Sequence, residues 1–75
     1  MIHKEELFKQ IGKRVAWHRK ETGLTQQMLA DAMNRSRSTI SRIEEGRYNH
    51  NIPLSTLVDI ANTLRLPISV FFEDY

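Results

Sequence analysis

The 75-residue sequence predicts a single compact all-α domain, residues 1–75, built from five helices. Apolar side chains recur three and four positions apart along most of the chain, which is the period of a helix buried on one face. Glycine, proline and asparagine separate these periodic segments, as they do where helices end. No internal repeat, low-complexity segment or long linker divides the chain, so one domain is expected.

The first helix is predicted from about Glu5 to Glu21. Its apolar face comprises Leu7, Phe8, Ile11, Val15 and His18. On this face His18 is expected to be a packed core residue, whereas Trp17 lies off the face and is expected on the surface. Gly23 follows the helix and supplies the left-handed conformation with which helices often stop.

A short second helix is expected to begin after Thr25, whose hydroxyl can accept a hydrogen bond from a free N–H of the first turn. Leu29 and Met33 provide its apolar contacts, and Ala30 permits the close approach of a neighbouring helix. Asn34 tolerates positive φ, as a tight turn between two helices requires. The pattern therefore predicts two helices joined by a tight turn over residues 25–45.

The third helix begins after the cap Ser36 and ends at Gly46. At about 100° per residue, Ile40 and Ile43 face the core. One polar arc on the opposite side holds Arg37, Ser38, Ser41, Arg42 and Glu45. Arginine and hydroxyl groups on an exposed helix can pair with base edges and phosphates in a DNA major groove.

A loop from Arg47 to Ile52 precedes Pro53, which is placed to open the fourth helix. The apolar stripe predicted for that helix comprises Leu54, Leu57, Ile60, Ala61 and Leu64. Pro67 then stops the helix and begins a last short turn through Phe71 and Phe72. These segments complete the five predicted helices.

Charge is unevenly distributed, although the net charge is only +2. Residues 1–47 carry ten Lys/Arg against six Asp/Glu, or +4, whereas residues 48–75 carry one against three, or −2. This asymmetry is typical of a molecule with one phosphate-facing side. An ordinary solvated surface is the alternative.

Other function classes receive little support. The chain has no cysteine, so it forms neither a disulfide nor a thiolate zinc site. His3, His18 and His50 are too scattered for a metal site, and no serine has a base at recognisable spacing. We expect no enzyme activity, cofactor or small-molecule ligand. Without a membrane-length apolar run or a signal-peptide pattern, a cytoplasmic location is expected.

The strongest motif runs from Leu24-Thr25-Gln26 through Leu29-Ala30 to Ser36–Glu44 and Gly46. Together with the helix order, it resembles the phage-repressor (Cro-like) family of helix-turn-helix domains, over about residues 11–72. This family includes short transcriptional regulators and restriction–modification controller proteins. The resemblance implies a lambda-repressor-like fold, with the third helix in the major groove and the second across the backbone.

By position, the resemblance gives Gln26 a phosphate contact and Arg47 a backbone contact. It implies that the base readers are Arg37, Ser38, Ser41 and Arg42. It also implies an ion pair between Arg19 and Glu44. The complete set expected at DNA is Gln26, Gln27, Arg35, Ser36, Arg37, Ser38, Thr39, Ser41, Arg42 and Arg47.

Three residues depart from the family pattern: Asn34 replaces a glycine, Arg35 an apolar residue, and His18 a leucine. Asn34 bears positive φ at a mild cost. For Arg35 there are two interpretations: either the turn is more open, or the guanidinium gains a phosphate contact. None of the three lies on the arc from Arg37 to Arg42.

The expected function is a sequence-specific transcriptional regulator that binds a palindromic double-stranded DNA operator as a homodimer, with no membrane partner. A restriction–modification controller or a phage or plasmid repressor fits best. An antitoxin is the rival, although the toxin-wrapping tail such proteins usually carry is not expected here; a helical interaction module is another. Three aromatic side chains in the last five residues favour a dimer surface within residues 66–75. It comprises Leu66, Val70, Phe71, Phe72 and Tyr75.

Overall fold

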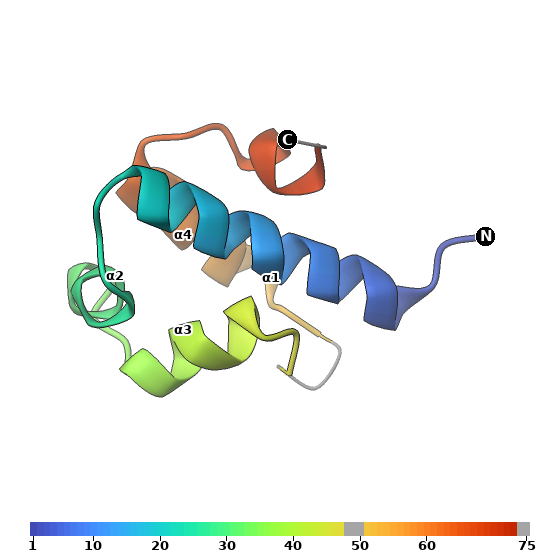
Figure 1. Ribbon diagram of the computed structural model, residues 1–75, viewed down its shortest axis with the longest axis horizontal. Coiled ribbons are helices and arrows are strands. Elements are labelled where there is room, and N and C mark those ends of the chain that lie inside the picture. The colour runs from blue at the N-terminus through green and yellow to red at the C-terminus, as the bar shows by residue number, and fades with distance from the viewer. Residues whose placement is uncertain (48–50, 74–75) are drawn as a thin grey trace.

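Four α-helices and one 3-10 helix appear in the computed structural model, which describes residues 1–47 and 51–73 (Figure 1). The elements are α1 (Lys4–Glu21), α2 (Gln26–Ala32), α3 (Arg37–Glu44), α4 (Leu54–Leu64) and η1 (Ile68–Phe72). No strand occurs in the described part of the chain, so the predicted all-α class is confirmed. The fifth helix predicted from the sequence is the short 3-10 segment η1 rather than an α-helix.

The predicted helix boundaries are formed by the expected local chemistry. The Thr25 hydroxyl accepts a 3.0 Å hydrogen bond from the Met28 N–H at the start of α2. Ser36 does the same for the Thr39 N–H at 3.2 Å, and this bond caps α3. Gly23 and Asn34 adopt φ values of +83° and +56°, the left-handed region predicted for both turns. Local sequence signals therefore place α2 and α3 correctly.

Helix α1 lies between two groups of elements. In Figure 1, α2 and α3 lie below α1, η1 lies above it, and α4 passes behind it. Gly12 marks the point where α1 crosses the end of α3: an added Cβ would lie 2.2 Å from the Ile43 carbonyl oxygen. Only a glycine allows this approach, so Gly12 fixes how closely α1 packs on α3.

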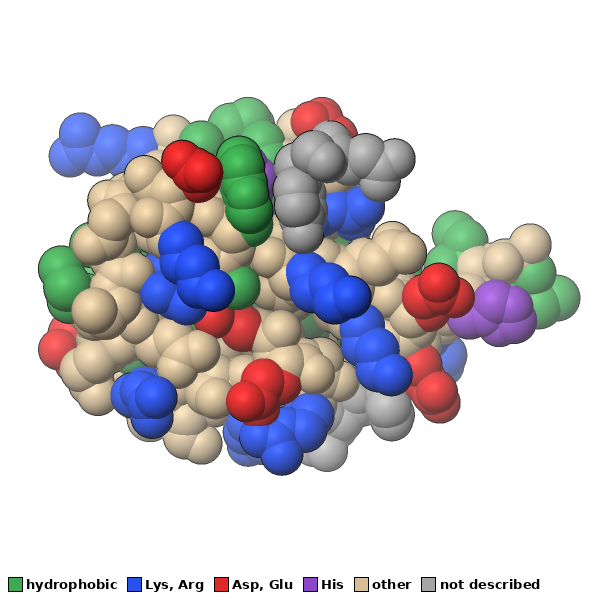
Figure 2. Space-filling model, viewed as in Figure 1, with side chains coloured by type: hydrophobic (Ala, Val, Ile, Leu, Met, Phe, Trp, Pro, Cys, Tyr) green, Lys and Arg blue, Asp and Glu red, His purple; other side chains and the backbone are tan. Residues whose placement is uncertain are grey.

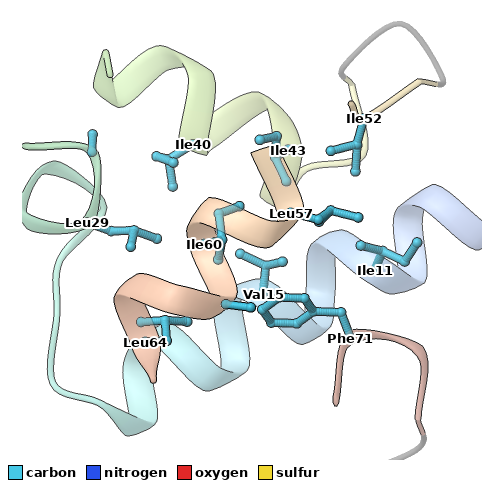
Figure 3. Close-up of a cluster of buried hydrophobic side chains, with 12 residues drawn as sticks. Ile11, Val15, Leu29, Ile40, Ile43, Ile52, Leu57, Ile60, Leu64 and Phe71 are labelled. Carbon is cyan, nitrogen blue, oxygen red and sulfur yellow. The ribbon is translucent and has the colours of Figure 1, made fainter. Parts of the chain in front are cut away.

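One hydrophobic cluster joins all five elements and Ile52, which lies two residues before α4 (Figure 3). Its buried members are Ile11, Val15, Leu29, Ala30, Ile40, Ile43, Ile52, Leu57, Ile60, Ala61, Leu64 and Phe71. Most of the apolar stripe predicted for α4 is buried in this cluster. The inclusion of Leu54 was wrong, because its side chain is 65% exposed. Leu54 lies in the first turn of α4, before the buried face begins at Thr56 and Leu57.

The two phenylalanines of η1 face opposite ways. Phe71 is fully buried and its ring points into the core cluster, whereas Phe72 is 48% exposed. The assignment of Phe71 to a dimer surface was therefore wrong: the monomer's own core uses this side chain. Arg14, itself buried in α1, donates a 3.2 Å hydrogen bond to the Phe71 carbonyl oxygen. This bond attaches η1 to α1.

His18 is half-buried at the edge of the core, as its place on the apolar face of α1 predicted. Its ring meets the Phe71 ring edge-on at a centroid distance of 6.0 Å. The exposed Trp17 ring also meets the His18 ring edge-on, at a centroid distance of 4.9 Å. The imidazole therefore contacts two aromatic rings at a position where an apolar side chain was expected.

Candidate nucleic-acid interface

Helix α3 presents a polar face to solvent and an apolar face to the core. Ile40 and Ile43 are completely buried, while Arg37, Ser38 and Arg42 are exposed. Arg37 and Arg42 are five residues apart, or about 7.5 Å along the axis at 1.5 Å per residue. Base pairs stack about 3.4 Å apart along each strand, so this spacing spans about two base-pair steps. The face has the dimensions and donor groups of a major-groove probe.

A buried ion pair holds the C-terminal end of α3. The Arg19 guanidinium donates to both carboxylate oxygens of Glu44, at 2.6 and 2.9 Å, and both side chains are more than 90% buried. Arg19 also donates to the Leu24 carbonyl oxygen at 2.8 Å. This confirms the pair that the family resemblance implied. It joins the last turns of α1 and α3 to the turn before α2.

The two glutamines that open α2 have intramolecular partners. The Gln26 amide donates to Glu44 at 3.0 Å, so it belongs to the same network as Arg19. The Gln27 amide donates to Asp31 at 2.8 Å, one turn along α2. Either side chain must exchange or share its partner to reach a phosphate. Backbone N–H groups at the start of α2 are the other donors available there.

Arg35 also reaches into the protein. From the turn between α2 and α3, its guanidinium donates to the Thr56 hydroxyl at 3.2 Å and to the Asp59 carboxylate at 3.0 Å. The structure thus provides a partner that neither sequence interpretation of Arg35 considered. A carboxylate on α4 balances the positive charge of the turn.

The remaining predicted residues cluster around α3. The hydroxyls of Ser36 and Thr39 lie 3.0 Å apart at the capped N-terminus, and Ser41 is partly exposed. Arg47, beyond the C-terminal end, forms an exposed ion pair with Glu45. The structure therefore places the predicted DNA-facing residues on α3, at its two ends and at the start of α2. The side chains of four of them form bonds within the chain: Gln26, Gln27, Arg35 and Arg47. Tyr75, predicted at the dimer surface, lies outside the described residues.

Lysine and arginine side chains spread over the face formed by α1 and α3 (Figure 2). Acidic side chains lie among them, so the face is basic but not uniformly positive. Across residues 1–47 and 51–73, no three His, Cys, Asp or Glu side chains are grouped to hold a metal ion. No helix in those ranges is long and apolar enough to cross a membrane.

Sequence reasoning missed Gly12, Thr56 and Asp59, which all act through contacts between distant segments. Gly12 lies inside a helical pattern, where an isolated glycine lowers helix stability. A glycine at such a position indicates close packing, and this was the signal available in the sequence. Thr56 and Asp59 lie on a helix whose polar positions follow no recognisable motif. Only the folded chain places them opposite Arg35.

Comparison with known proteins gives consistent results. The sequence profile of the helix-turn-helix family matches residues 15–71. The immunity repressor protein of Bacillus phage phi105 is 44% identical over 59 residues, which cover 79% of this chain and 40% of that protein. An uncharacterized HTH-type transcriptional regulator of Methanothermobacter thermautotrophicus is 47% identical over 38 residues, covering 51% of this chain and 55% of that protein. The chain thus spans about half the length of these relatives or less.

Two solved structures share the fold. The restriction–modification controller protein C.AhdI from Aeromonas hydrophila superposes with a TM-score of 0.84 at 28% identity, covering 96% of this chain and 100% of that one. An HTH_3 family transcriptional regulator from Vibrio cholerae also gives 0.84, at 27% identity, covering 93% of this chain and 38% of that one.

Proposed function

Because the chain belongs to the helix-turn-helix family, we propose that it is a transcriptional regulator that binds a palindromic DNA operator as a homodimer. The observation that carries this proposal is the outward face of α3. Two arginines project from a helix that is fixed by a side-chain cap at one end and a buried ion pair at the other. A rigid helix holds such groups in register with base edges.

Arg37 and Arg42 are the principal base readers in this proposal. Each can donate two parallel hydrogen bonds to a guanine, the most common specific contact in the major groove. Ser38 and Ser41 lie on the same arc and complete the contact surface. Arg47, and Gln26 once it exchanges its bond to Glu44, would contact phosphate and set the position of α3.

Selection of bound sequences from random duplexes tests the DNA-binding proposal directly. We expect one palindromic site to be enriched, and Arg37→Ala or Arg42→Ala to weaken binding to it by about 1–3 kcal/mol while relaxing base preference at one position. Arg47→Ala should weaken all duplexes evenly. Wild-type protein that enriches no sequence would refute the proposal.

A dimer contact is proposed at η1 and the residues before it. Phe72 is 48% exposed, and Leu66 and Val70, which precede it in the chain, are partly exposed. To read two half-sites on one face of DNA, a symmetric contact there must hold the two α3 helices about 34 Å apart. Sedimentation should show a dimer that Phe72→Ala shifts toward monomer. The matched control is Val58→Ala, because Val58 is also apolar and exposed but lies on α4.

Similarity favours two kinds of regulator: a phage repressor, from the phi105 immunity repressor, and a restriction–modification controller, from the C.AhdI structure. The genes beside this one distinguish them. A methyltransferase and an endonuclease next to the selected operator would support a controller. Phage genes next to it would support a repressor.

A further inference from the structure

The turn that joins α2 to α3 is tied to α4 by one side chain, Arg35. We propose that Arg35 positions the recognition helix through Thr56 and Asp59, and that it is not a phosphate ligand. Its role is to fix the start of α3 so that Arg37 meets its base in the correct orientation. This inference rests on the proposed function, since it assigns a residue that sets the specificity of the same site.

The contact has two points. One terminal nitrogen of the guanidinium donates to the Thr56 hydroxyl at 3.2 Å, and the other donates to the Asp59 carboxylate at 3.0 Å. Thr56 is only 1% exposed, so the first bond enters the protein interior. Two bonds to residues three positions apart on one helix fix the direction of the planar guanidinium as well as its distance.

The backbone around Arg35 transmits this restraint to α3. The Arg35 N–H donates to the Ala30 carbonyl oxygen at 2.8 Å and so closes α2. The next residue, Ser36, caps α3, and Arg37 is the first residue of that helix. The anchored side chain is therefore one residue from the cap and two from a proposed base reader. Loss of the anchor would loosen the N-terminal end of α3.

Charge also argues against a phosphate role. The Asp59 carboxylate compensates the Arg35 guanidinium, and their side chains are 33% exposed for Arg35 and 50% for Asp59. To bind a phosphate at full strength, Arg35 would have to leave Asp59 and release the buried Thr56 hydroxyl from its bond.

Asp59→Asn separates the two roles, because it weakens the anchor but makes the protein more positive. If Arg35 positions α3, Asp59→Asn weakens binding to the selected operator. If Arg35 binds phosphate, the same change releases it and strengthens binding to every duplex. Arg35→Ala and the double variant complete a thermodynamic cycle. Glu21→Gln, which removes a carboxylate at the exposed end of α1, is the control for net charge.

Binding is measured at several salt concentrations, to the selected operator and to a scrambled duplex, under conditions where denaturation shows every variant to be folded. We expect Asp59→Asn and Arg35→Ala each to weaken operator binding about three- to fivefold, the range of a partly exposed ion pair. The double variant should be no weaker than Arg35→Ala alone. Scrambled-duplex binding by Asp59→Asn should match that of the Glu21→Gln control, because both changes remove one negative charge. The salt slope of Arg35→Ala should stay that of the wild-type protein.

Two results would overturn the inference. A salt slope that falls by about 0.9 in Arg35→Ala, together with stronger binding by Asp59→Asn, would make Arg35 a phosphate ligand. Unchanged operator affinity in both folded single variants would make the contact purely structural. Failure of the proposed function is a separate result: wild-type protein would then bind operator and scrambled duplex equally, and this inference would fall with it.

Discussion

The two ends of α3, the proposed recognition helix, are held by ion pairs of different kinds. At the C-terminal end, Arg19 and Glu44 form a bidentate pair whose side chains are 8% and 5% exposed. At the N-terminal end, Arg35 and Asp59 are 33% and 50% exposed. Charges removed from water depend heavily on one another, whereas exposed charges keep their hydration. Removing one partner of the pair at the C-terminal end should therefore destabilise the fold more than removing one partner of the pair at the N-terminal end, next to Arg37.

The largest expected effect comes from breaking the buried pair. Glu44→Ala leaves the Arg19 charge buried without its carboxylate and removes the partner of Gln26. We expect the free energy of unfolding to fall by about 3–5 kcal/mol, a large part of the stability of a domain this small. Urea denaturation measures the change. Glu45→Ala, at the neighbouring exposed carboxylate, should stay within about 1 kcal/mol. Equal stability of Glu44→Ala and wild type would contradict the comparison.

Gly12→Ala tests packing at the same end. The added methyl group would lie 2.2 Å from the Ile43 carbonyl oxygen, so α1 must move away from α3. Overpacking of this kind costs about 1–3 kcal/mol and outweighs the gain of up to about 1 kcal/mol in helix propensity. Thermal unfolding should show a lower midpoint, while the exposed control Lys13→Ala stays near wild type. A more stable Gly12→Ala protein would show that the crossing is loose.

A smaller effect is expected from the cap at the N-terminal end. Ser36→Ala removes the acceptor for the Thr39 N–H and should destabilise the protein by about 1 kcal/mol. Ser36→Asp keeps an acceptor at this position and should recover most of the loss. Chemical denaturation of the three proteins decides the matter. If Ser36→Asp is as unstable as Ser36→Ala, capping does not explain the change.

The exposed pair should have the smallest effect on stability. Asp59→Asn is expected to lower the free energy of unfolding by less than about 1 kcal/mol, and 1 M salt should abolish the difference because it screens exposed charges. The loss in Glu44→Ala should persist in 1 M salt. Denaturation curves at low and high salt measure both. An Asp59→Asn loss that is large and independent of salt would remove the distinction between the two ends.

Sequence analysis succeeded where the signal is local. Thr25, Ser36, Gly23 and Asn34 act within a few residues of their own position, and all four have the predicted conformation or bond. It failed where two neighbours compete for one buried place. Phe71 and Phe72 are equally apolar, and only the docking of η1 on α1 decides that Phe71 is buried.

Of the two contacts between distant segments at α3, one was predicted and the other was not. The pair of Arg19 and Glu44 was predicted because the resemblance supplied it. Arg35 and Asp59 are 24 residues apart and belong to no motif, so nothing in the pattern connected them. The DNA-facing roles on α3 remain predictions that the experiments above address.

Helix α1 links η1 to α3, and this link bears on the operator the protein can bind. Arg14 fastens η1 to one side of this helix, and Arg19 fastens α3 to the other. In the proposed dimer joined through η1, α1 would therefore set the distance between the two α3 helices. One extra base pair between half-sites adds about 3.4 Å of axial offset and, at about 10.5 base pairs per turn, rotates one half-site by about 34°. The continuous helix α1 cannot lengthen to follow that offset, so under the proposed dimer contact the protein would select the distance between half-sites as well as their bases.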